Sequence, residues 1–481
     1  MKTLPIKKTK IVCTIGPASQ DQAVLEQMIK NGMNIARINF AHGDADSHRQ
    51  TVANVRAAAK AAGRRVAIFG DLPGPKMRIG KLDQESVELE QGDSFVLHTE
   101  EIVGNNERAS IDFNRLPHVV NPQDSIFMND GIIELTVTEV QEDEVHCTVK
   151  AGGELRSNKG VNFPGIDLGI SAFTKYDQQC LKLAAELQLD GVSQSFVLSA
   201  RDIKTVRLAA TDLNYQPLII AKIERSGALK YIDELIEAAD AIMVARGDLG
   251  VEIPIENIPS VQKEIIRKTN LAGKPVITAT QMLESMTSNR RPTRAEATDV
   301  ANAIIDGTDC VMLSGETAVG RYPVETVSTM ARIAQQTEAT MPKFTIVDLL
   351  RAQKQAETIS KGDLLSLIVF LTAEMLEPLV VLAPARSGGT ARRLTRFRLP
   401  QWIISPSQYE HTCQRLQFSY GIFAVYVPDS DTLETPQLRR EFARELLAPY
   451  MTDHGSDMVL VVEGAGTLRT ADTKRIDMVT L

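Results

Sequence analysis

Short apolar runs recur along the chain, and segments with helical spacing follow them. The eight runs begin at Lys10, Ile35, Val66, Gly191, Pro217, Ala241, Pro275 and Cys310. Continuous apolar strands that alternate with helices are typical of a parallel sheet that is buried on both faces. Eight such units predict an α/β fold with a closed (β/α)8 TIM barrel, whose functional residues lie at the carboxyl ends of the strands.

Local signals mark where two of the helices begin or end. Thr293 and Glu296 form a capping box, and Gly307 follows the last apolar position of the same helix. Pro323 stands where the next helix is expected to start, because proline fits the first turn of a helix. The sequence therefore predicts one helix between Thr293 and Gly307 and another that starts at Pro323.

The interval between residues 73 and 160 breaks the alternation of strands and helices. Apolar residues there recur at every second position, as at Val87 and Leu89, which is the pattern of half-buried strands. An Asn-Asp-Gly sequence at 129–131 is a hairpin-turn signal. We expect a small antiparallel β domain, inserted after the third barrel strand, where it would form a lid over the barrel mouth.

A third region follows the barrel. The segments "LVVLAPARSGGTARR" and "DMVLVVEGAG" are typical of strands that lead into glycine-rich turns, so a separate C-terminal α/β domain is expected. The predicted division is a barrel of residues 1–72 and 161–344, a lid of residues 73–160 and a C-terminal domain of residues 345–481.

Composition narrows the class of protein. The chain has 481 residues and a formal net charge of −8, which argues against general binding to nucleic acid or to a membrane surface. Its five cysteines form no CxxC pair, so we predict neither a disulfide framework nor a zinc site. This use of cysteine suits a reducing compartment, and we predict a cytoplasmic location. The seven histidines show neither the HxxxH nor the HxxH spacing of metal ligands, so a metal would be held by carboxylates, as Mg²⁺ is.

The most apolar segment, Leu364 to Ala383, is interrupted by Glu374, Glu377 and Pro378. A membrane span needs about 20 consecutive apolar residues. We therefore expect a buried helix followed by a buried strand, and no membrane association.

The clearest candidate chemistry lies at the end of the fifth run. Lys222 and Glu224 are two residues apart, so in a strand they point to the same side. Asp248 ends the neighbouring run, and two carboxylates from adjacent strands can hold one Mg²⁺ beside the ammonium group. The same residues would also fit a structural ion pair at a strand end.

Other polar residues end neighbouring strands but carry weaker signals. Arg37 and Asn39 share a face after the second run, where an arginine suits phosphate or carboxylate. Lys76 and Arg78 lie in the glycine- and proline-rich segment "GDLPGPKMRIG". For Arg37 alone, a packed side chain is the favoured interpretation. A hinge explains the glycines and prolines of the second segment equally well, but it does not explain the paired cations. Thr280, after the seventh run, is uninformative by itself.

Together these segments resemble the pyruvate kinase family. The strings that carry the resemblance, in the family's order and spacing, are "RINFAHG", "GDLPGPKMRIG", "NKGVNFPG", "AKIER", "MVARGDLGVEIP", "ATQMLESM", "RPTRAEATDVANAIIDGTDCVMLSGETA" and "YPVETV". The resemblance implies Mg²⁺-dependent transfer of the phosphoryl group of phosphoenolpyruvate to ADP, which gives pyruvate and ATP. It also implies the barrel, lid and C-terminal domains, and a homotetramer.

The resemblance assigns roles at the barrel mouth. It implies that Glu224 and Asp248 hold Mg²⁺ or Mn²⁺, that Lys222 stabilises the phosphoryl group and the enolate, and that the enolate is protonated near Thr280. The implied substrate contacts are Arg37, Lys222, Gly247, Asp248 and Thr280. The implied nucleotide contacts are Asn39, Phe40, Ala41, His42, Arg78 and Lys159.

Two positions depart from the relatives that require potassium. Those relatives place a serine and a glutamate where this chain has Ala41 and Lys76. A fixed ammonium group can take the electrostatic role of a monovalent cation. Our hypothesis is that Lys76 replaces K⁺ and that Asn39 and Asp71 no longer form a full potassium site. A solvated lysine on a hinge is the alternative.

The C-terminal segment "APARSGGTARRLTRFR" resembles the turn at which related bacterial enzymes bind an allosteric sugar phosphate. Backbone N–H groups and nearby arginines suit a phosphate group. The candidate effector residues are Ser387, Gly388, Thr390 and Arg392. A charged helix face that makes subunit contacts would give the same pattern.

Two other functions use part of this pattern. An Mg²⁺-dependent aldolase or lyase that acts on pyruvate-like enolates would also place a glutamate and an aspartate on the metal. It would not need a lid, nucleotide contacts from Arg78 and Lys159, or Lys222. A sugar-phosphate sensor with an inactive barrel would be expected to lack Lys222, Glu224 or Asp248, and all three are present.

Overall fold

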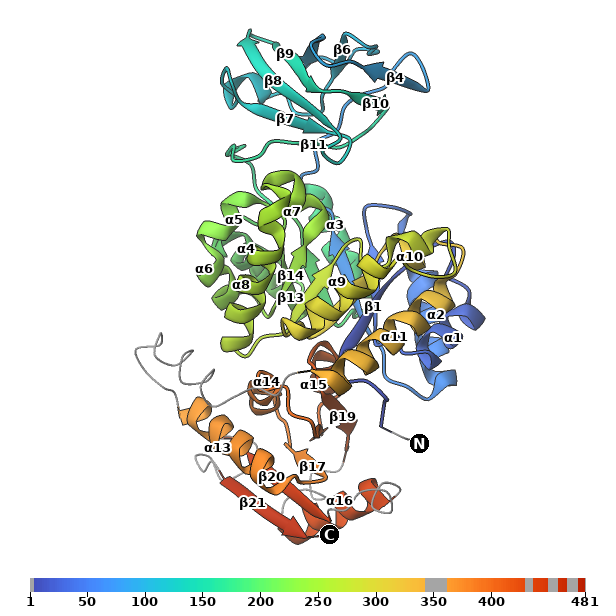
Figure 1. Ribbon diagram of the computed structural model, residues 1–481, viewed down its shortest axis with the longest axis vertical. Helices are drawn as coiled ribbons and strands as arrows, with labels where there is room; N and C mark the ends of the chain where they lie inside the picture. Colours follow the sequence, from blue (N-terminus) through green and yellow to red (C-terminus); the bar gives the residue numbers. More distant parts are fainter. Residues whose placement is uncertain (1–3, 342–360, 429–435, 449–456, 465–474, 481) are drawn as a thin grey trace.

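The chain folds into three regions stacked along the long axis of the molecule, as Figure 1 shows. This computed structural model describes residues 4–341, 361–428, 436–448, 457–464 and 475–480. The barrel lies in the middle, with an antiparallel β domain beyond one end and the C-terminal α/β domain beyond the other. The predicted boundary at residues 344 and 345 lies outside the described residues, and the predicted domain limits stay predictions.

The central region is a closed parallel barrel in the order β1-β16-β15-β14-β13-β12-β3-β2. Its strands are β1 (Lys10–Ile15), β2 (Ile35–Asn39), β3 (Ala67–Leu72), β12 (Gly191–Gln194), β13 (Leu218–Ile223), β14 (Ala241–Ala245), β15 (Val276–Ala279) and β16 (Cys310–Leu313). All eight predicted runs are barrel strands. Most strand residues are buried because alternate side chains fill the barrel interior or pack under the surrounding helices.

Helices surround the barrel. The longer ones are α1 (Gln22–Lys30), α2 (Ala45–Ala62), α3 (Lys175–Glu186), α4 (Ala200–Asp212), α8 (Ile258–Leu271), α9 (Arg294–Ile305) and α11 (Pro323–Thr340). The shorter ones are α5 (Ser226–Lys230), α6 (Ile232–Ala238), α7 (Arg246–Glu252) and α10 (Gly315–Ala318). The predicted capping box is present, with Thr293 and Glu296 each accepting from the other's backbone N–H, and α11 begins at Pro323 as predicted.

The inserted region has its own hydrophobic core and two antiparallel or mixed sheets. Its strands are β4 (Ser86–Leu89), β5 (Ser94–His98), β6 (Arg108–Ser110), β7 (Ser125–Met128), β8 (Ile133–Val140), β9 (Glu144–Ala151), β10 (Gly153–Arg156) and β11 (Val161–Asn162). The predicted turn joins β7 to β8, and its residues 129–131 all have positive φ. Figure 1 shows this domain beyond the end of the barrel near α7 and α3.

The C-terminal region is built on a five-stranded sheet in the order β19-β18-β17-β20-β21, in which β21 is antiparallel. The strands are β17 (Val380–Leu382), β18 (Trp402–Ser407), β19 (Ile422–Tyr426), β20 (Met458–Glu463) and β21 (Arg475–Thr480). Its helices are α13 (Lys361–Leu376), α14 (Gly389–Thr395), α15 (Glu410–Arg415) and α16 (Pro436–Leu447).

The apolar segment near residue 370 forms α13 and then β17, the helix and strand that the sequence predicts. The helix differs from the prediction in one respect, because only one of its faces is buried. Val369 and Phe370 lie in the core, whereas Leu364 and Met375 are exposed. Within the described residues, no helix combines the length and the apolar character needed to cross a bilayer.

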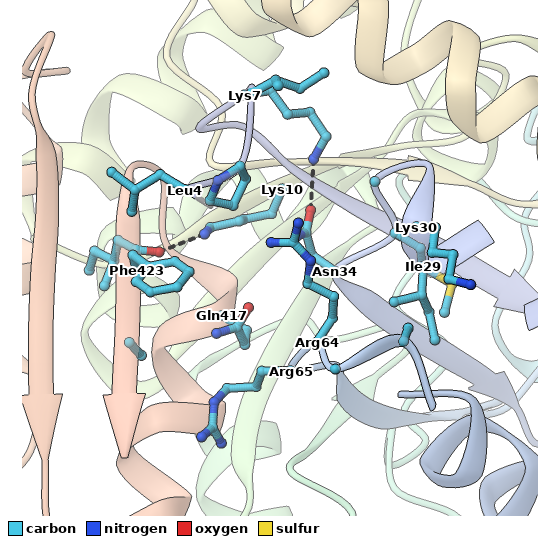
Figure 2. Close-up of a pocket in the computed structure, with 18 of the residues that line it drawn as sticks. Leu4, Lys7, Lys10, Ile29, Lys30, Asn34, Arg64, Arg65, Gln417 and Phe423 are labelled. Carbon is cyan, nitrogen blue, oxygen red and sulfur yellow. Dashed lines mark hydrogen bonds between the residues drawn. The ribbon is translucent and has the colours of Figure 1, made fainter. Parts of the chain in front are cut away.

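The amino-terminal ends of the barrel strands face the C-terminal region. Lys10 Nζ donates to the carbonyl oxygen of Ile422 at 2.7 Å, and Lys8 Nζ donates to that of Pro400 at 2.6 Å. A cavity of about 740 Å³ lies at this junction. Figure 2 shows residues that line it, among them Lys7, whose Nζ donates to Asn34 Oδ1 at 2.8 Å. These contacts leave the carboxyl ends of the strands facing the inserted domain.

Candidate active site

Asp71, near the end of β3, is the buried centre of the polar cluster in the barrel mouth. Its carboxylate accepts from Arg37 Nε on β2 at 2.8 Å and from Ser193 Oγ on β12 at 2.5 Å. Lys222 Nζ on β13 lies 3.3 Å from it. Although burial raises it, the charges of Lys222 and Arg37 bring the pKa of Asp71 down to about 2. The aspartate is therefore a fixed anion that aligns two cations.

Lys222 is held in one position by three strands. Its Nζ donates to Ser195 Oγ at 2.6 Å and forms an ion pair with Glu224 Oε1 at 2.9 Å, in addition to its contact with Asp71. Although burial lowers it, Asp71 and Glu224 raise the pKa of Lys222 to about 12. The side chain is buried and charged, so it is suited to stabilise negative charge that develops beside it.

Glu224 and Asp248 are the predicted metal ligands. Glu224 directly follows β13, and its Oε2 accepts from the backbone N–H of Phe196 at 2.8 Å. Burial raises the pKa of Glu224, Lys222 opposes this effect, and the negative charge of Asp248 adds to it. Two carboxylates that repel each other fit a divalent cation. Among the described residues no group of three or more His, Cys, Asp or Glu could hold a metal, so substrate oxygens or water would complete its coordination.

Arg246 positions the short helix α7, which carries Gly247 and Asp248. Its guanidinium donates to both carboxylate oxygens of Asp299 on α9, at 2.6 and 2.7 Å. It also donates to the carbonyl oxygen of Thr280 at 2.9 Å. A Cβ atom on Gly247 would lie only 2.7 Å from Thr280 Cγ2. Glycine is therefore required where α7 passes Thr280, and the predicted substrate residues of β14 and β15 lie together.

Lys76 lies at the junction between the barrel and the inserted domain. Its Nζ is 3.8 Å from Asp248 Oδ1, and a Cβ atom on Gly160 would meet its Cε at 3.0 Å. Asp71 has Arg37 and Lys222 as its charged partners. The structure thus pairs Lys76 with a predicted metal ligand.

The predicted nucleotide residues come from two places. Arg78 and Lys159 are on the inserted domain, where Arg78 Nη1 donates to the carbonyl oxygen of Asn158 at 2.9 Å. The turn after β2 is on the barrel, and Asn39 Oδ1 accepts from the backbone N–H of Ala41 at 3.2 Å. No hydrogen bond or ion pair in the described part of the chain joins the two groups.

The four residues of the turn after β2 differ in what they can offer a ligand. Phe40 is a core residue, because a Cβ atom on Gly70 would lie 2.3 Å from its ring. Only its backbone could contact a nucleotide. Ala41 and His42 are exposed.

The predicted effector residues lie at the start of α14. Gly388 has a φ of 81°, and Ser387 beside it is exposed. The hydroxyl of Thr390 faces Gly464, where a Cβ atom would come within 2.1 Å of its Oγ1. Arg392 Nη1 lies over Gly388, 3.0 Å from where a Cβ atom would be. Arg392 also lines a cavity next to the barrel.

The sequence patterns did not lead us to predict three residues of the site: Ser193, Ser195 and Arg246. Ser193 and Ser195 have the same two-residue spacing as Lys222 and Glu224, so the run "GVSQSFV" carried a usable signal. Arg246 carried none, because its partner Asp299 is far away in the sequence and only the fold joins them.

A TIM barrel with a buried lysine, a pair of facing carboxylates and an inserted β domain over its mouth belongs to the class of barrel enzymes that act on anionic substrates. Comparison with known proteins defines the family. The family model for pyruvate kinase, barrel domain, matches residues 6–327, and that for pyruvate kinase, alpha/beta domain, matches residues 363–476.

Curated relatives agree with the family models. The chain is 44% identical to the pyruvate kinase of Thermococcus litoralis, over 98% of this chain and 94% of the relative. It is 42% identical to that of Geobacillus stearothermophilus, over 97% and 79%, and 37% identical to that of Clostridium perfringens, over 98% and 99%. The chain belongs to the pyruvate kinase family and is an enzyme.

Proposed function

We propose that this enzyme transfers the phosphoryl group of phosphoenolpyruvate to ADP, giving pyruvate and ATP, with Mg²⁺ or Mn²⁺ as cofactor. The observation that carries the proposal is the buried Lys222, 2.9 Å from Glu224 and beside Asp71. An ammonium group fixed next to metal-binding carboxylates is suited to a migrating phosphoryl group. A loose phosphoryl transition state mainly requires alignment and neutralisation of charge.

The side chains divide the work between the two halves of the substrate. Lys222 stabilises the transferring phosphoryl group and the enolate that remains, and Arg37 contacts the same phosphoryl group. Glu224 and Asp248 would hold the divalent cation, which supplies positive charge to the substrate oxygens when it is bound. The charge of Asp71 keeps both cationic side chains aligned, and this fixed geometry removes the need for reorganisation during the reaction.

The carboxylate end of the substrate lies against α7. The backbone of Gly247 and Asp248 binds the substrate carboxylate, with Gly247 allowing the close approach. The enolate is protonated on the side of Thr280, through water. The close packing of Thr280 against Gly247 supports this arrangement, because it brings both to one end of the pocket.

The nucleotide binds between the barrel and the inserted domain. We propose contacts from Arg78 and Lys159 on the inserted domain and from Asn39, Phe40, Ala41 and His42 on the barrel. Their separation in this structure fits a lid that closes when both substrates are bound. Closure excludes water, which would otherwise hydrolyse the phosphoryl donor.

The enzyme does not require K⁺ in our proposal, because the ammonium group of Lys76 supplies a fixed charge at the barrel mouth. Its position 3.8 Å from Asp248 supports this role, because it puts the charge beside a proposed ligand of the divalent cation. Those two residues would form no full potassium site.

The C-terminal domain is regulatory in our proposal. A phosphorylated metabolite binds at Ser387, Gly388, Thr390 and Arg392. The enzyme is a cytoplasmic homotetramer that binds neither nucleic acid nor membranes. The exposed apolar side chains of α13 support subunit contacts through this domain.

The proposal is tested by measuring pyruvate formation with lactate dehydrogenase as coupling enzyme, with and without ADP. We expect pyruvate only when phosphoenolpyruvate, ADP and a divalent cation are all present, and a lyase would not depend on ADP. Lys222→Met should lower kcat at least a thousandfold while binding of phosphoenolpyruvate persists, because the charge acts mainly on the transition state. Near-normal turnover of this variant would remove Lys222 from its role.

A further inference from the structure

A small basic cavity lies between the C-terminal domain and the amino-terminal end of the barrel. Its volume is about 200 Å³. Arg392 and Arg393 of α14 and Arg415 of α15 line one side, and Asp240 and Lys274, which precede β14 and β15, line the other. In Figure 1, α14 and α15 lie directly between the barrel and the C-terminal sheet.

Positive charge exceeds negative charge in this cavity. Among the described residues that line it, four side chains are cationic and Asp240 is the single carboxylate. That carboxylate already serves other groups, since its Oδ2 accepts from the backbone N–H of Ile219 at 3.0 Å and from Arg207 Nη2 at 3.1 Å. Arg415 Nη2 lies farther away, at 3.7 Å. One shared aspartate therefore does not balance the cations around it.

The cationic side chains differ in how many of their N–H groups already donate hydrogen bonds within the protein. Lys274 Nζ donates to three carbonyl oxygens at the end of α6, each at 2.6 Å, so it adds charge but has no donor to spare. Arg415 Nη2 donates to the carbonyl oxygen of Pro217 at 3.2 Å, which leaves its other nitrogens available. Within the described part of the chain, the guanidinium of Arg392 has neither a hydrogen bond nor an ion pair.

The environment of Arg392 is unfavourable for a charge without a counter-ion. Burial, and after it the nearby charge of Arg415, lower the pKa of Arg392 to about 10, and the charge of Asp240 opposes them only in part. Burying a charge costs far less free energy when a counter-ion lies beside it than when it has none. The cavity of Figure 2 differs in this respect, because Lys7 and Lys10 there already donate to oxygens of the protein.

We propose that this cavity binds a phosphate group, which Arg392 and Arg415 hold from the C-terminal side while the barrel side closes around it. Guanidinium groups suit this ligand because their paired N–H donors match the spacing of phosphate oxygens. The cavity volume of about 200 Å³ is several times the roughly 30 Å³ that one water molecule occupies in the liquid, so the cavity is large enough for one phosphate group. The bound anion would join the C-terminal domain to the barrel.

This site goes beyond the proposed effector turn. It shares Arg392 with that turn, but Arg415 belongs to the cavity alone and Ser387 to the turn alone. The two sites can therefore be separated by variants that affect one of them. Neither residue belongs to the catalytic machinery at the opposite end of the barrel.

The experiment is calorimetric titration of the full-length enzyme with inorganic phosphate, at constant ionic strength maintained with chloride. We expect Arg415→Gln and Arg392→Gln each to weaken phosphate binding at least tenfold. Arg386→Gln, which changes an exposed arginine just before α14, is the matched control and should bind as the wild type does. Unchanged affinity in Arg415→Gln would overturn the proposal, as would a loss of binding confined to Ser387→Ala.

A second titration identifies the source of the phosphate group. If glycerol 3-phosphate binds and competes with inorganic phosphate in an Arg415-dependent manner, the ligand is a phosphate monoester. If inorganic phosphate alone binds in that manner, the ligand is the free ion. Asp240→Asn should tighten binding in either case, because it removes a carboxylate that lines the cavity, and weaker binding in this variant would contradict the charge argument.

Discussion

At the scale of single residues, Asp71 organises the active site. We assigned it from the sequence to the region of a monovalent cation, whereas its contacts in the structure are with Arg37, Ser193 and Lys222. A carboxylate that is completely buried between two cations is costly to remove, since either cation would then lack its partner. Asp71 thus links the chemistry of the site to the stability of the barrel.

This link predicts how stability changes with pH. The pKa of Asp71 is about 2 in the folded protein and about 3.9 in an unfolded chain. Because the folded value is lower, the charged carboxylate contributes stability above pH 4, on the order of 2 kcal/mol, which is lost as the pH falls from about 4 to 2. Urea unfolding between pH 5 and pH 2 should show this loss in the wild type.

The matched variant for this measurement is Asp71→Asn. It keeps the shape of the side chain and removes the titrating group, so its free energy of unfolding should be lower at pH 5 and should fall less steeply below pH 4. Equal slopes for the two proteins would mean that Asp71 has no depressed pKa.

The role of Lys76 is also a prediction at this scale. The wild type should be active in Tris buffer without potassium, and added K⁺ should stimulate it less than twofold. Lys76→Glu should lower turnover without potassium at least tenfold, because it replaces the ammonium group that pairs with Asp248 by another carboxylate. Potassium should partly restore this variant. Strong stimulation of the wild type by K⁺ in the coupled assay would refute the hypothesis.

At the scale of secondary structure, the sequence predicted the elements whose signals are local. The eight barrel strands, the helix that starts with Thr293 and the hairpin at 129–131 all depend on neighbouring residues, and all are present. Helix α7 was not predicted, because Asp299 stabilises its first residue from another helix. The exposed face of α13 was also missed, because a run of apolar residues does not reveal which of them find partners.

The contact between Arg246 and Asp299 gives a prediction for α7. Lysine can carry the charge at position 246 but cannot donate to both carboxylate oxygens of Asp299 and to Thr280 together. Arg246→Lys should therefore displace α7, weaken Mn²⁺ binding about tenfold and lower kcat by a similar factor. Electron paramagnetic resonance measures free Mn²⁺ directly, and Arg201→Lys, on the exposed face of α4, is the control.

Unaltered Mn²⁺ affinity in Arg246→Lys would show that the position of Asp248 does not depend on this ion pair. A loss of kcat without a change in metal binding would instead assign Arg246 to the substrate side of the site.

At the scale of the whole molecule, the three regions meet at two junctions, one at each end of the barrel. The inserted domain faces the carboxyl ends of the barrel strands, where the catalytic cluster lies, and the C-terminal domain contacts the amino ends. A change in the C-terminal domain can therefore reach the active site through the barrel or, in the homotetramer that we propose, through another subunit. Charged contacts connect the C-terminal domain directly to the barrel, and one of them is the ion pair of Arg398 with Asp309 at 3.2 Å.

Communication between the subunits of the proposed tetramer would depend on contacts made by the exposed face of α13. Leu364, Ile368 and Met375 share that face and are 50%, 44% and 82% exposed. Apolar side chains gathered on one helix face mark an interaction surface, and burial of each would stabilise an assembly by roughly 1 kcal/mol or more. Ile368→Lys should therefore shift the enzyme from tetramers to smaller species.

Sedimentation velocity of the full-length enzyme measures this shift directly. The matched control is Val103→Lys, which changes a branched side chain that is 66% exposed on the inserted domain and should leave the tetramer intact. If α13 joins subunits, Ile368→Lys should also remove any sigmoidal response to phosphoenolpyruvate, because dissociated subunits cannot influence one another, while Lys222 and Glu224 remain in place to catalyse transfer. A tetramer that survives this substitution would place the subunit contacts on another surface.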